Sequence, residues 1–174
     1  NCSTIRRYTK LTNEGTKAIG IEYVSSAMIN NIGNFGPGNI TEKLSIIKAN
    51  NSWKGEGQWD SFSPDELGWV ENEDFQLSGI FQTNFGSMSS NKYLPFALIE
   101  DKESNITWYW QIEHNGGWHW EMSNLPGNVN NKFQKSHPTY LYLGGPDEMH
   151  HQAWKSIEPS ATYTTIPVSI GCVK

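Results

Sequence analysis

The segment ITWYWQIEHNGGWHWEM, residues 106 to 122, decides the fold of this chain. It holds four of the eight tryptophans, Trp108, Trp110, Trp118 and Trp120. On both sides of the central Asn-Gly-Gly, apolar side chains alternate with polar ones, which is the period of two that half-buried strands show. The segment therefore predicts two antiparallel strands joined by a tight turn.

The length of this turn follows from the two faces of the predicted strands. A two-residue loop would place Trp120 opposite Gln111 and so mix apolar and polar side chains on one face. A three-residue loop over 115–117 instead pairs Ile112 with Trp120 and keeps each face uniform. We therefore predict the three-residue loop, with Gly117 in the left-handed conformation as a bulge.

In this register one face of the strand pair is apolar, and Gln111 and Glu121 point to the other. The apolar side chains are those of Ile106, Trp108, Trp110, Ile112, Trp118, Trp120 and Met122. Exposed indole rings could stack on the flat C–H faces of a pyranose, but contiguous apolar surface of this extent is uncommon on soluble proteins. We predict that most of these rings are core, with Trp118, beside the turn, as the expected exception.

The polar face carries the candidate acid/base pair. Glu113 stands opposite His119 in the predicted register, and Glu and His can act as general acid and base, as in sugar epimerases built on β-sandwiches. The same two residues are also an ordinary cross-strand polar pair. We favour the structural interpretation, because their neighbours do not converge on an obvious pocket. Trp118, Glu113 and His119 are the candidate substrate-binding residues.

The other polar motifs predict no catalytic or metal site. His150 and His151 are adjacent, and in a strand adjacent side chains point to opposite faces, which argues against a zinc site. Glycoside cleavage by paired carboxylates needs two acids across a cleft, and the spacing of the acidic residues selects no such pair. We therefore expect no cofactor, no metal and no catalytic residue in this chain.

Composition limits the class of protein. The 174 residues suffice for one domain with a core, and 13 basic against 18 acidic side chains argue against a nucleic-acid partner. No run of 18 apolar residues predicts a membrane span, and no signal-peptide pattern opens the chain. Cys2 and Cys172 are too few for a disulfide framework, so we expect free thiols.

Short alternating segments and 16 glycines, without a long amphipathic helix, predict one all-β domain over residues 1–174. Strands are expected at 2–11, 17–28, 44–49, 93–100, 137–143 and 161–173, with the first two forming a hairpin. The segment SPDELG, residues 63–68, combines an N-cap serine, a proline and two acids before a glycine. It predicts one short helical turn.

Four motifs together resemble a known family. Residues 51–59 (NSWKGEGQW), 93–95 (YLP), 111–121 (QIEHNGGWHWE) and 144–155 (GGPDEMHHQAWK) resemble the N-terminal domain of glycoside hydrolase family 36, the bacterial and fungal α-galactosidases. The similarity is spread along nearly the whole chain. It implies an antiparallel β-supersandwich of the galactose-mutarotase type, in agreement with the strand pattern.

The resemblance also implies what this chain lacks. The family's two catalytic aspartates belong to a following (β/α)₈ barrel, and the nucleophile lies in a Lys-Trp-Asp motif. Trp59 and Asp60 follow Gln58 here, so that motif is not matched and no catalytic residue is carried over. The chain resembles the latter part of the N-terminal domain, without its opening strands and without the barrel.

The resemblance further implies a parent enzyme that hydrolyses terminal α-galactosyl residues of oligosaccharides. The implied partners are the catalytic barrel of the same polypeptide and, through it, galactosides. The implied setting is a cytoplasmic homo-oligomer, with no nucleic acid and no membrane.

Three functions stay open for the chain itself. A structural module of the parent requires neither an exposed sugar platform nor a catalytic cleft, and we rank it first. A free-standing carbohydrate-binding module predicts exposed aromatic rings and measurable sugar affinity. A mutarotase-like epimerase predicts that Glu113 and His119 converge in a cleft.

Overall fold

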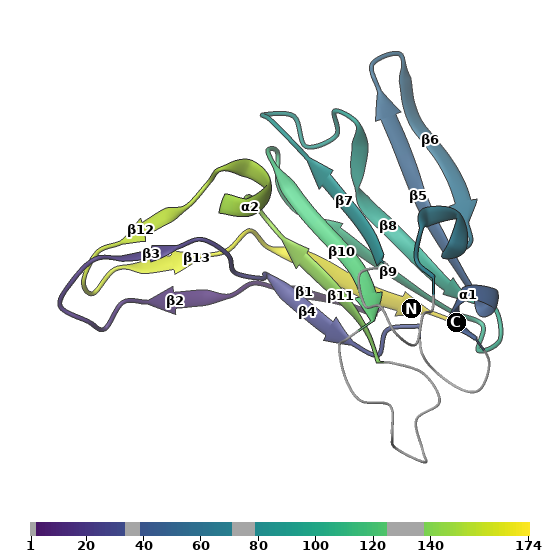
Figure 1. Cartoon of the computed structure of the whole chain (residues 1–174), viewed down its shortest axis with the longest axis horizontal. Coiled ribbons are helices and arrows are strands. Elements are labelled where there is room, and N and C mark those ends of the chain that lie inside the picture. The colour runs from purple at the N-terminus through teal and green to yellow at the C-terminus, as the bar shows by residue number, and fades with distance from the viewer. Residues whose placement is uncertain (1–2, 34–38, 71–78, 125–137) are drawn as a thin grey trace.

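The computed structural model describes residues 3–33, 39–70, 79–124 and 138–174, and it is an antiparallel all-β sandwich, as predicted. The strands are β1 (Ser3–Arg7), β2 (Lys10–Thr12), β3 (Ile19–Ile21), β4 (Ala27–Asn30), β5 (Leu44–Ser52), β6 (Gly55–Phe62), β7 (Gly79–Asn84), β8 (Tyr93–Asp101), β9 (Ile106–Ile112), β10 (Trp118–Asn124), β11 (Thr139–Gly144), β12 (Lys155–Ile157), β13 (Thr162–Thr164) and β14 (Val168–Val173). Six of them form the larger sheet, in the order β1-β14-β9-β8-β5-β6. Four form the smaller sheet, in the order β4-β11-β10-β7 (Figure 1).

Two further strand pairs lie outside the sandwich. β2 pairs with β13 and β3 with β12, and Figure 1 shows these four short strands as an arm extending from the sheets. The predicted hairpin between residues 2–11 and 17–28 is therefore wrong. Each of the first four strands pairs with a strand from the last third of the chain, because the alternating pattern fixes a strand's faces but not its partner.

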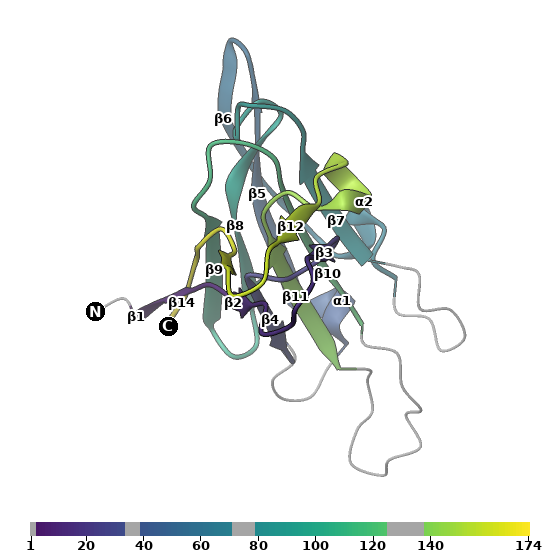
Figure 2. The same ribbon diagram turned by 90° about the vertical axis from the view of Figure 1, so that its left-hand side faces the viewer.

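The two strands of the tryptophan-rich segment do not form the predicted hairpin either. β9 pairs with β8 and β14 in the larger sheet, whereas β10 pairs with β7 and β11 in the smaller one. Seen from the side, they belong to different layers (Figure 2). The connection crosses from one sheet to the other, so the predicted three-residue register, including Ile112 opposite Trp120 and Glu113 opposite His119, is wrong.

Burial explains why the chain crosses between the sheets at this point. Trp110 and Trp120 face each other across the sandwich, with ring centroids 5.2 Å apart in an edge-to-face arrangement, and neither ring is exposed. As hairpin neighbours the two indoles would lie side by side on one face and still need a cover. The predicted burial of both rings is confirmed, as is the opposite orientation of Gln111, which is exposed, and of Glu121, which is half-buried.

The core occupies the space between the two sheets. Besides these two rings it contains fully buried Trp69 and Trp118. Aliphatic side chains of both inner faces fill the rest, among them Leu44, Ile46, Ile99, Ile112, Met122, Leu141, Leu143 and Val168. The predicted exposure of Trp118 is therefore wrong: its ring points inward, and its Nε1–H donates to the Ser89 carbonyl at 2.6 Å.

Three short helical segments complete the described part. They are α1 (Ile40–Lys43), the 3₁₀ turn η1 (Asp65–Leu67) and α2 (Glu148–His151). The turn at 63–68 is as predicted, since Ser63 and Glu66 hydrogen-bond each other's backbone N–H and Gly68 ends the turn in the left-handed conformation. None of the helices in these ranges is long and apolar enough to cross a membrane.

The two predicted thiols have different outcomes. Cys172 lies in β14 opposite Ser3 and is a free cysteine, as expected. Cys2 lies outside the described residues.

A candidate functional site on the outer face of the smaller sheet

The outer face of the smaller sheet carries a cluster of polar and aromatic side chains. Its centre is β10, where alternation directs His119 and Glu121 outward while Trp118 and Trp120 point into the core. The cluster consists of Tyr23, Thr83, His119, Glu121, Tyr140, Tyr142, Asp147 and His150. We refer to these residues as the outer-face cluster.

His119 is completely buried although it lies on an outer face. The imidazole of His150, supplied by α2, stacks on it with ring centroids 3.7 Å apart and an angle of 13°. Its Nε2 lies 3.3 Å from a carboxylate oxygen of Glu121, and its Nδ1 lies 2.7 Å from the Thr83 hydroxyl. Because a carboxylate only accepts, Nε2 carries the proton, and in the neutral ring Thr83 donates to Nδ1.

Glu121 is held as a carboxylate by its neighbours. The hydrogen bond from His119 is the main cause that lowers its pKa; burial opposes this shift, and a further hydrogen bond from the Tyr140 hydroxyl, 3.0 Å away, adds to it. Both carboxylate oxygens thus have a donor inside the protein. The carboxylate is satisfied but only half-buried, which leaves it within reach of another molecule.

Three tyrosines line the same face. Tyr23, from the segment before β4, stacks on Tyr142 with ring centroids 5.0 Å apart and an interplanar angle of 13°. Burial raises the pKa of Tyr23 to about 12 and also raises that of Tyr140 and Tyr142, so all three are neutral phenols near pH 7. Neutral phenol rings beside a carboxylate offer both stacking surface and hydrogen-bond groups.

α2 is attached to the cluster through its first residues. Asp147 caps the helix by accepting from the backbone N–H of His150 at 2.7 Å and from its Nδ1 at 2.8 Å. Burial alone would raise the pKa of Asp147, but the hydrogen bonds and charge of His150 outweigh it and the pKa is lowered. The interpretation of His150 and His151 as strand residues on opposite faces is wrong, because both belong to this helix.

His151 anchors α2 to the end of β7 and packs on the connection between β9 and β10. The Nε2 of His151 donates to the Asn84 carbonyl at 3.0 Å, and its Nδ1 accepts from the backbone N–H of Asp147 at 3.2 Å. The same imidazole packs on Gly117, where an added Cβ would lie 2.5 Å from the His151 ring. Gly117 does not have the left-handed conformation predicted for it; a glycine is needed there because the ring approaches the backbone so closely.

Glu113 lies on the opposite outer face and does not join this cluster. It accepts from Arg6 at 2.8 Å and from the Ser169 hydroxyl at 2.5 Å, and these bonds link β1 and β14 to the end of β9. The hydrogen bond from Ser169 is the first cause that lowers the pKa of Glu113, and Arg6 adds to it. The core of the sandwich therefore separates Glu113 from His119, so the two residues are neither the favoured cross-strand pair nor a converging acid/base pair.

The predicted site residues are thus found in three different places. Trp118 is in the core, Glu113 on the larger sheet and His119 in the outer-face cluster. Sequence reasoning missed Asp147, His150 and the tyrosines as neighbours of His119. One signal could have found the helix: in the run Gly-Pro-Asp-Glu, Asp147 is a typical N-cap before an acidic first turn.

The arrangement can bind and position groups but shows no place for a metal. Within 3–33, 39–70, 79–124 and 138–174, no group of three or more His, Cys, Asp or Glu side chains could hold an ion. His119 and His151 each have both ring nitrogens occupied by protein groups. What remains accessible is a hydrogen-bonded carboxylate beside phenol and imidazole rings.

Comparison with known proteins shows the fold. The sequence matches no protein-family model and no curated protein. Among solved structures, the α-galactosidase AgaA of glycoside hydrolase family 36 from Geobacillus stearothermophilus superposes with a TM-score of 0.72 at 12% identity, over 98% of this chain and 20% of that one. The predicted resemblance is therefore confirmed at the level of the fold.

Two further α-galactosidase structures agree. The galactosidase domain of the α-galactosidase-sucrose kinase AgaSK gives a TM-score of 0.70 at 17% identity, and an α-galactosidase from Lactobacillus brevis gives 0.70 at 11%. Each matches 98% of this chain, and the chain spans only about one fifth of their length, 20% and 19%.

Proposed function

We propose that this chain is a non-catalytic β-sandwich domain of an α-galactosidase. The observation that carries the proposal is the match of 98% of the chain, at TM-scores of 0.70 to 0.72, to one fifth of several α-galactosidase chains. The four sequence motifs that resemble the same family support it independently of the superposition. The parent enzyme would hydrolyse terminal α-galactosyl residues, and the galactoside would be bound by the parent.

The carboxylates of the described residues support a non-catalytic role. A retaining glycosidase holds a nucleophile and an acid/base carboxyl about 5–5.5 Å apart across a cleft. Here Glu113 joins strands, Glu121 is hydrogen-bonded to His119 and Tyr140, and Asp147 caps a helix. Each of these three carboxylates is already used by the fold, so none of the three is free to serve as the nucleophile or the acid/base of such a pair.

Exposed apolar side chains support packing against another part of the parent, which we propose is its (β/α)₈ barrel. Met149 of α2 is 79% exposed, and Phe85, whose ring contacts His151, is 62% exposed. Large apolar side chains gathered beside a polar cluster are typical of surfaces that bind a partner. The domain would cover one side of the barrel at this surface and shape the rim of its active site, in a parent that is a homo-oligomer.

The test is an assay with a chromogenic α-galactoside on the purified 174-residue protein and on the longer polypeptide encoded by its reading frame. The expected result is turnover by the longer polypeptide and none by the 174-residue protein. In the longer polypeptide, Met149→Asp should weaken the contact between domains and lower its unfolding temperature, while the equally exposed Trp53→Asp serves as the control. Turnover by the 174-residue protein that is lost on Glu121→Gln would overthrow the proposal.

A second candidate function is sugar binding by the outer-face cluster, as in a carbohydrate-binding module or an epimerase. One observation favours it: the carboxylate of Glu121, 18% exposed, lies beside the His119 imidazole and the Tyr140 phenol. Titration calorimetry with galactose and raffinose tests it. Binding that disappears in Tyr23→Ala would support this candidate, and polarimetry of freshly dissolved α-galactose would separate an epimerase from a binding module.

A further inference from the structure

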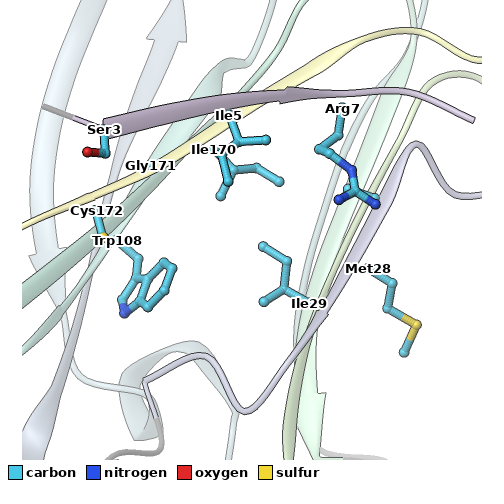
Figure 3. Close-up of a pocket in the computed structure, with 10 residues that line it drawn as sticks. Ser3, Ile5, Arg7, Met28, Ile29, Trp108, Ile170, Gly171 and Cys172 are labelled. Carbon is cyan, nitrogen blue, oxygen red and sulfur yellow. The ribbon is translucent and has the colours of Figure 1, made fainter.

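Among the residues that the structure describes, nothing closes one side of the sandwich. β1 is the last strand of the larger sheet there, β4 is the last strand of the smaller one, and an apolar groove of about 380 Å³ lies between them (Figure 3). Ile5 and Ile170 line it from the larger sheet, with Trp108 beyond them, and Ile29 faces them from β4.

The side chains of β1 show that no element of the described residues covers the inner side of this strand. Ile5 pairs directly with Ile170, and directly opposed residues point to the same side of a sheet. Ile170 is an inward-facing core residue and only 7% exposed, so Ile5 also points to the inner side, yet it is 62% exposed. This inward-facing isoleucine is exposed because no side chain of the described residues covers it from the opposite sheet.

Both edges of this opening offer backbone hydrogen bonds. β1 pairs only with β14, and β4 pairs only with β11, so in the described part of the chain each strand has one unpaired side. Exposed strand edges are templates for the addition of another strand. A compact apolar ligand would fill the groove but leave these N–H and C=O groups without a partner.

The size of the groove fits one strand. An apolar cavity of about 150 Å³ holds a benzene molecule, so a groove of about 380 Å³ holds two to three side chains of that size. β1 has five residues, and a strand of equal length directs three alternate side chains to one side. The number of side chains that fit is thus the number that one short strand would supply.

The charge of Arg7, at the edge of the groove, indicates which side chain an added strand should carry. Arg7 lines the groove and reaches from β1 toward β4 (Figure 3), and none of the ion pairs among the described residues involves it. Its neighbour Arg6, on the other side of β1, is paired with Glu113. An arginine at the mouth of an apolar groove is complemented by a carboxylate.

We propose that an extended polypeptide segment from outside these 174 residues adds as a strand to the free edge of β4, beneath β1. Its alternate apolar side chains fill the groove against Ile5, Ile29 and Ile170, and a carboxylate near one end pairs with Arg7. This inference does not depend on the proposed function, because it follows from the open strand edges, the apolar groove and the charge of Arg7.

The test uses two labelled nine-residue peptides of alternating valine and threonine. One peptide has a glutamate at its N-terminal end, and the other has it at its C-terminal end. Fluorescence anisotropy with the 174-residue protein should show saturable binding of one of them. Three changes should each weaken this binding by about tenfold or more, since each removes one proposed contact. They are methylation of alternate backbone nitrogens in the peptide, and the protein variants Ile5→Asp and Arg7→Glu. The Arg7→Glu protein should bind again when a lysine replaces the glutamate of the peptide.

Two matched variants control for surface charge. Arg6→Glu alters the opposite side of the same strand, and Ile19→Asp alters an exposed isoleucine of the arm; both should bind the peptide as the unchanged protein does. Hydrogen exchange adds an independent readout, because the backbone amides of β4 should become protected when the peptide binds and those of the arm should not.

Four results would overturn the proposal. They are the absence of binding by both peptides, equal binding of the backbone-methylated peptide, Arg7-dependent binding of decanoate without binding of either peptide, and self-association of the protein that is abolished by Ile5→Asp. The third would make the groove a site for a small apolar carboxylate, and the fourth would make it an interface between two copies of this chain.

Discussion

The two facing indoles allow the sandwich to be tested by a single substitution. Trp120→Ala removes a ring that is completely buried and makes an edge-to-face contact with Trp110 at 5.2 Å. Burying an indole removes roughly 150–250 Å² from water, and at about 25 cal/mol per Å² this amounts to roughly 4–6 kcal/mol. The Nε1 of Trp120 has no hydrogen-bond partner, so no hydrogen bond is lost with the ring. We therefore expect a loss of about 3–5 kcal/mol in the free energy of unfolding, the usual range for a large ring deleted from a core.

Urea unfolding followed by far-ultraviolet circular dichroism measures this loss without depending on tryptophan fluorescence. Trp53→Ala is the matched control, because that ring is 81% exposed, and it should change stability by less than about 0.5 kcal/mol. A double-mutant cycle with Trp110→Ala should give a coupling of about 0.5–1.5 kcal/mol for the ring pair. A loss below about 1 kcal/mol for Trp120→Ala, or additive effects in the cycle, would refute the packing of the two sheets on these rings.

Three further predictions concern the polar contacts. Gly117→Ala forces a Cβ against the His151 ring and should lower the free energy of unfolding by about 1–3 kcal/mol. In a protein that also carries His151→Ala the same substitution should cost much less, and thermal unfolding of the single and double variants measures the difference. Hydrogen bonds lower the pKa of Glu121 and Asp147 in the folded state. The stability that these two carboxylates contribute is therefore present above their unfolded pKa and is lost as the pH falls through the folded pKa. Urea midpoints measured from pH 7 downward should decrease, and the decrease should be smaller in Glu121→Gln. Arg6→Ala should cost less than about 1 kcal/mol, because surface ion pairs are weak and this arginine side chain is 59% exposed; a larger loss would mean that the bond to Glu113 holds β1 in place.

The sequence by itself determined the local features of this protein. The period of two on either side of residues 113–117 determined that β9 and β10 are strands and that Trp110 and Trp120 point inward while Gln111 and Glu121 do not. Propensity and capping determined the turn at 63–68. These features depend on neighbours within a few residues, and the burial of apolar side chains enforces them whatever the strand partner is.

Only the tertiary structure decided which strands are neighbours. An alternating segment has the same faces whether it pairs with the next strand in sequence or with one at the other end of the chain, so neither the pairing of β1 with β14 nor the crossing from β9 to β10 could be read from the pattern. The pairing of the strands depends on how both sheets pack over the core together. As a result His119 lies beside His150 and not beside Glu113. The site was therefore missed for a physical reason: its members come from elements that only the packing of the two sheets brings together.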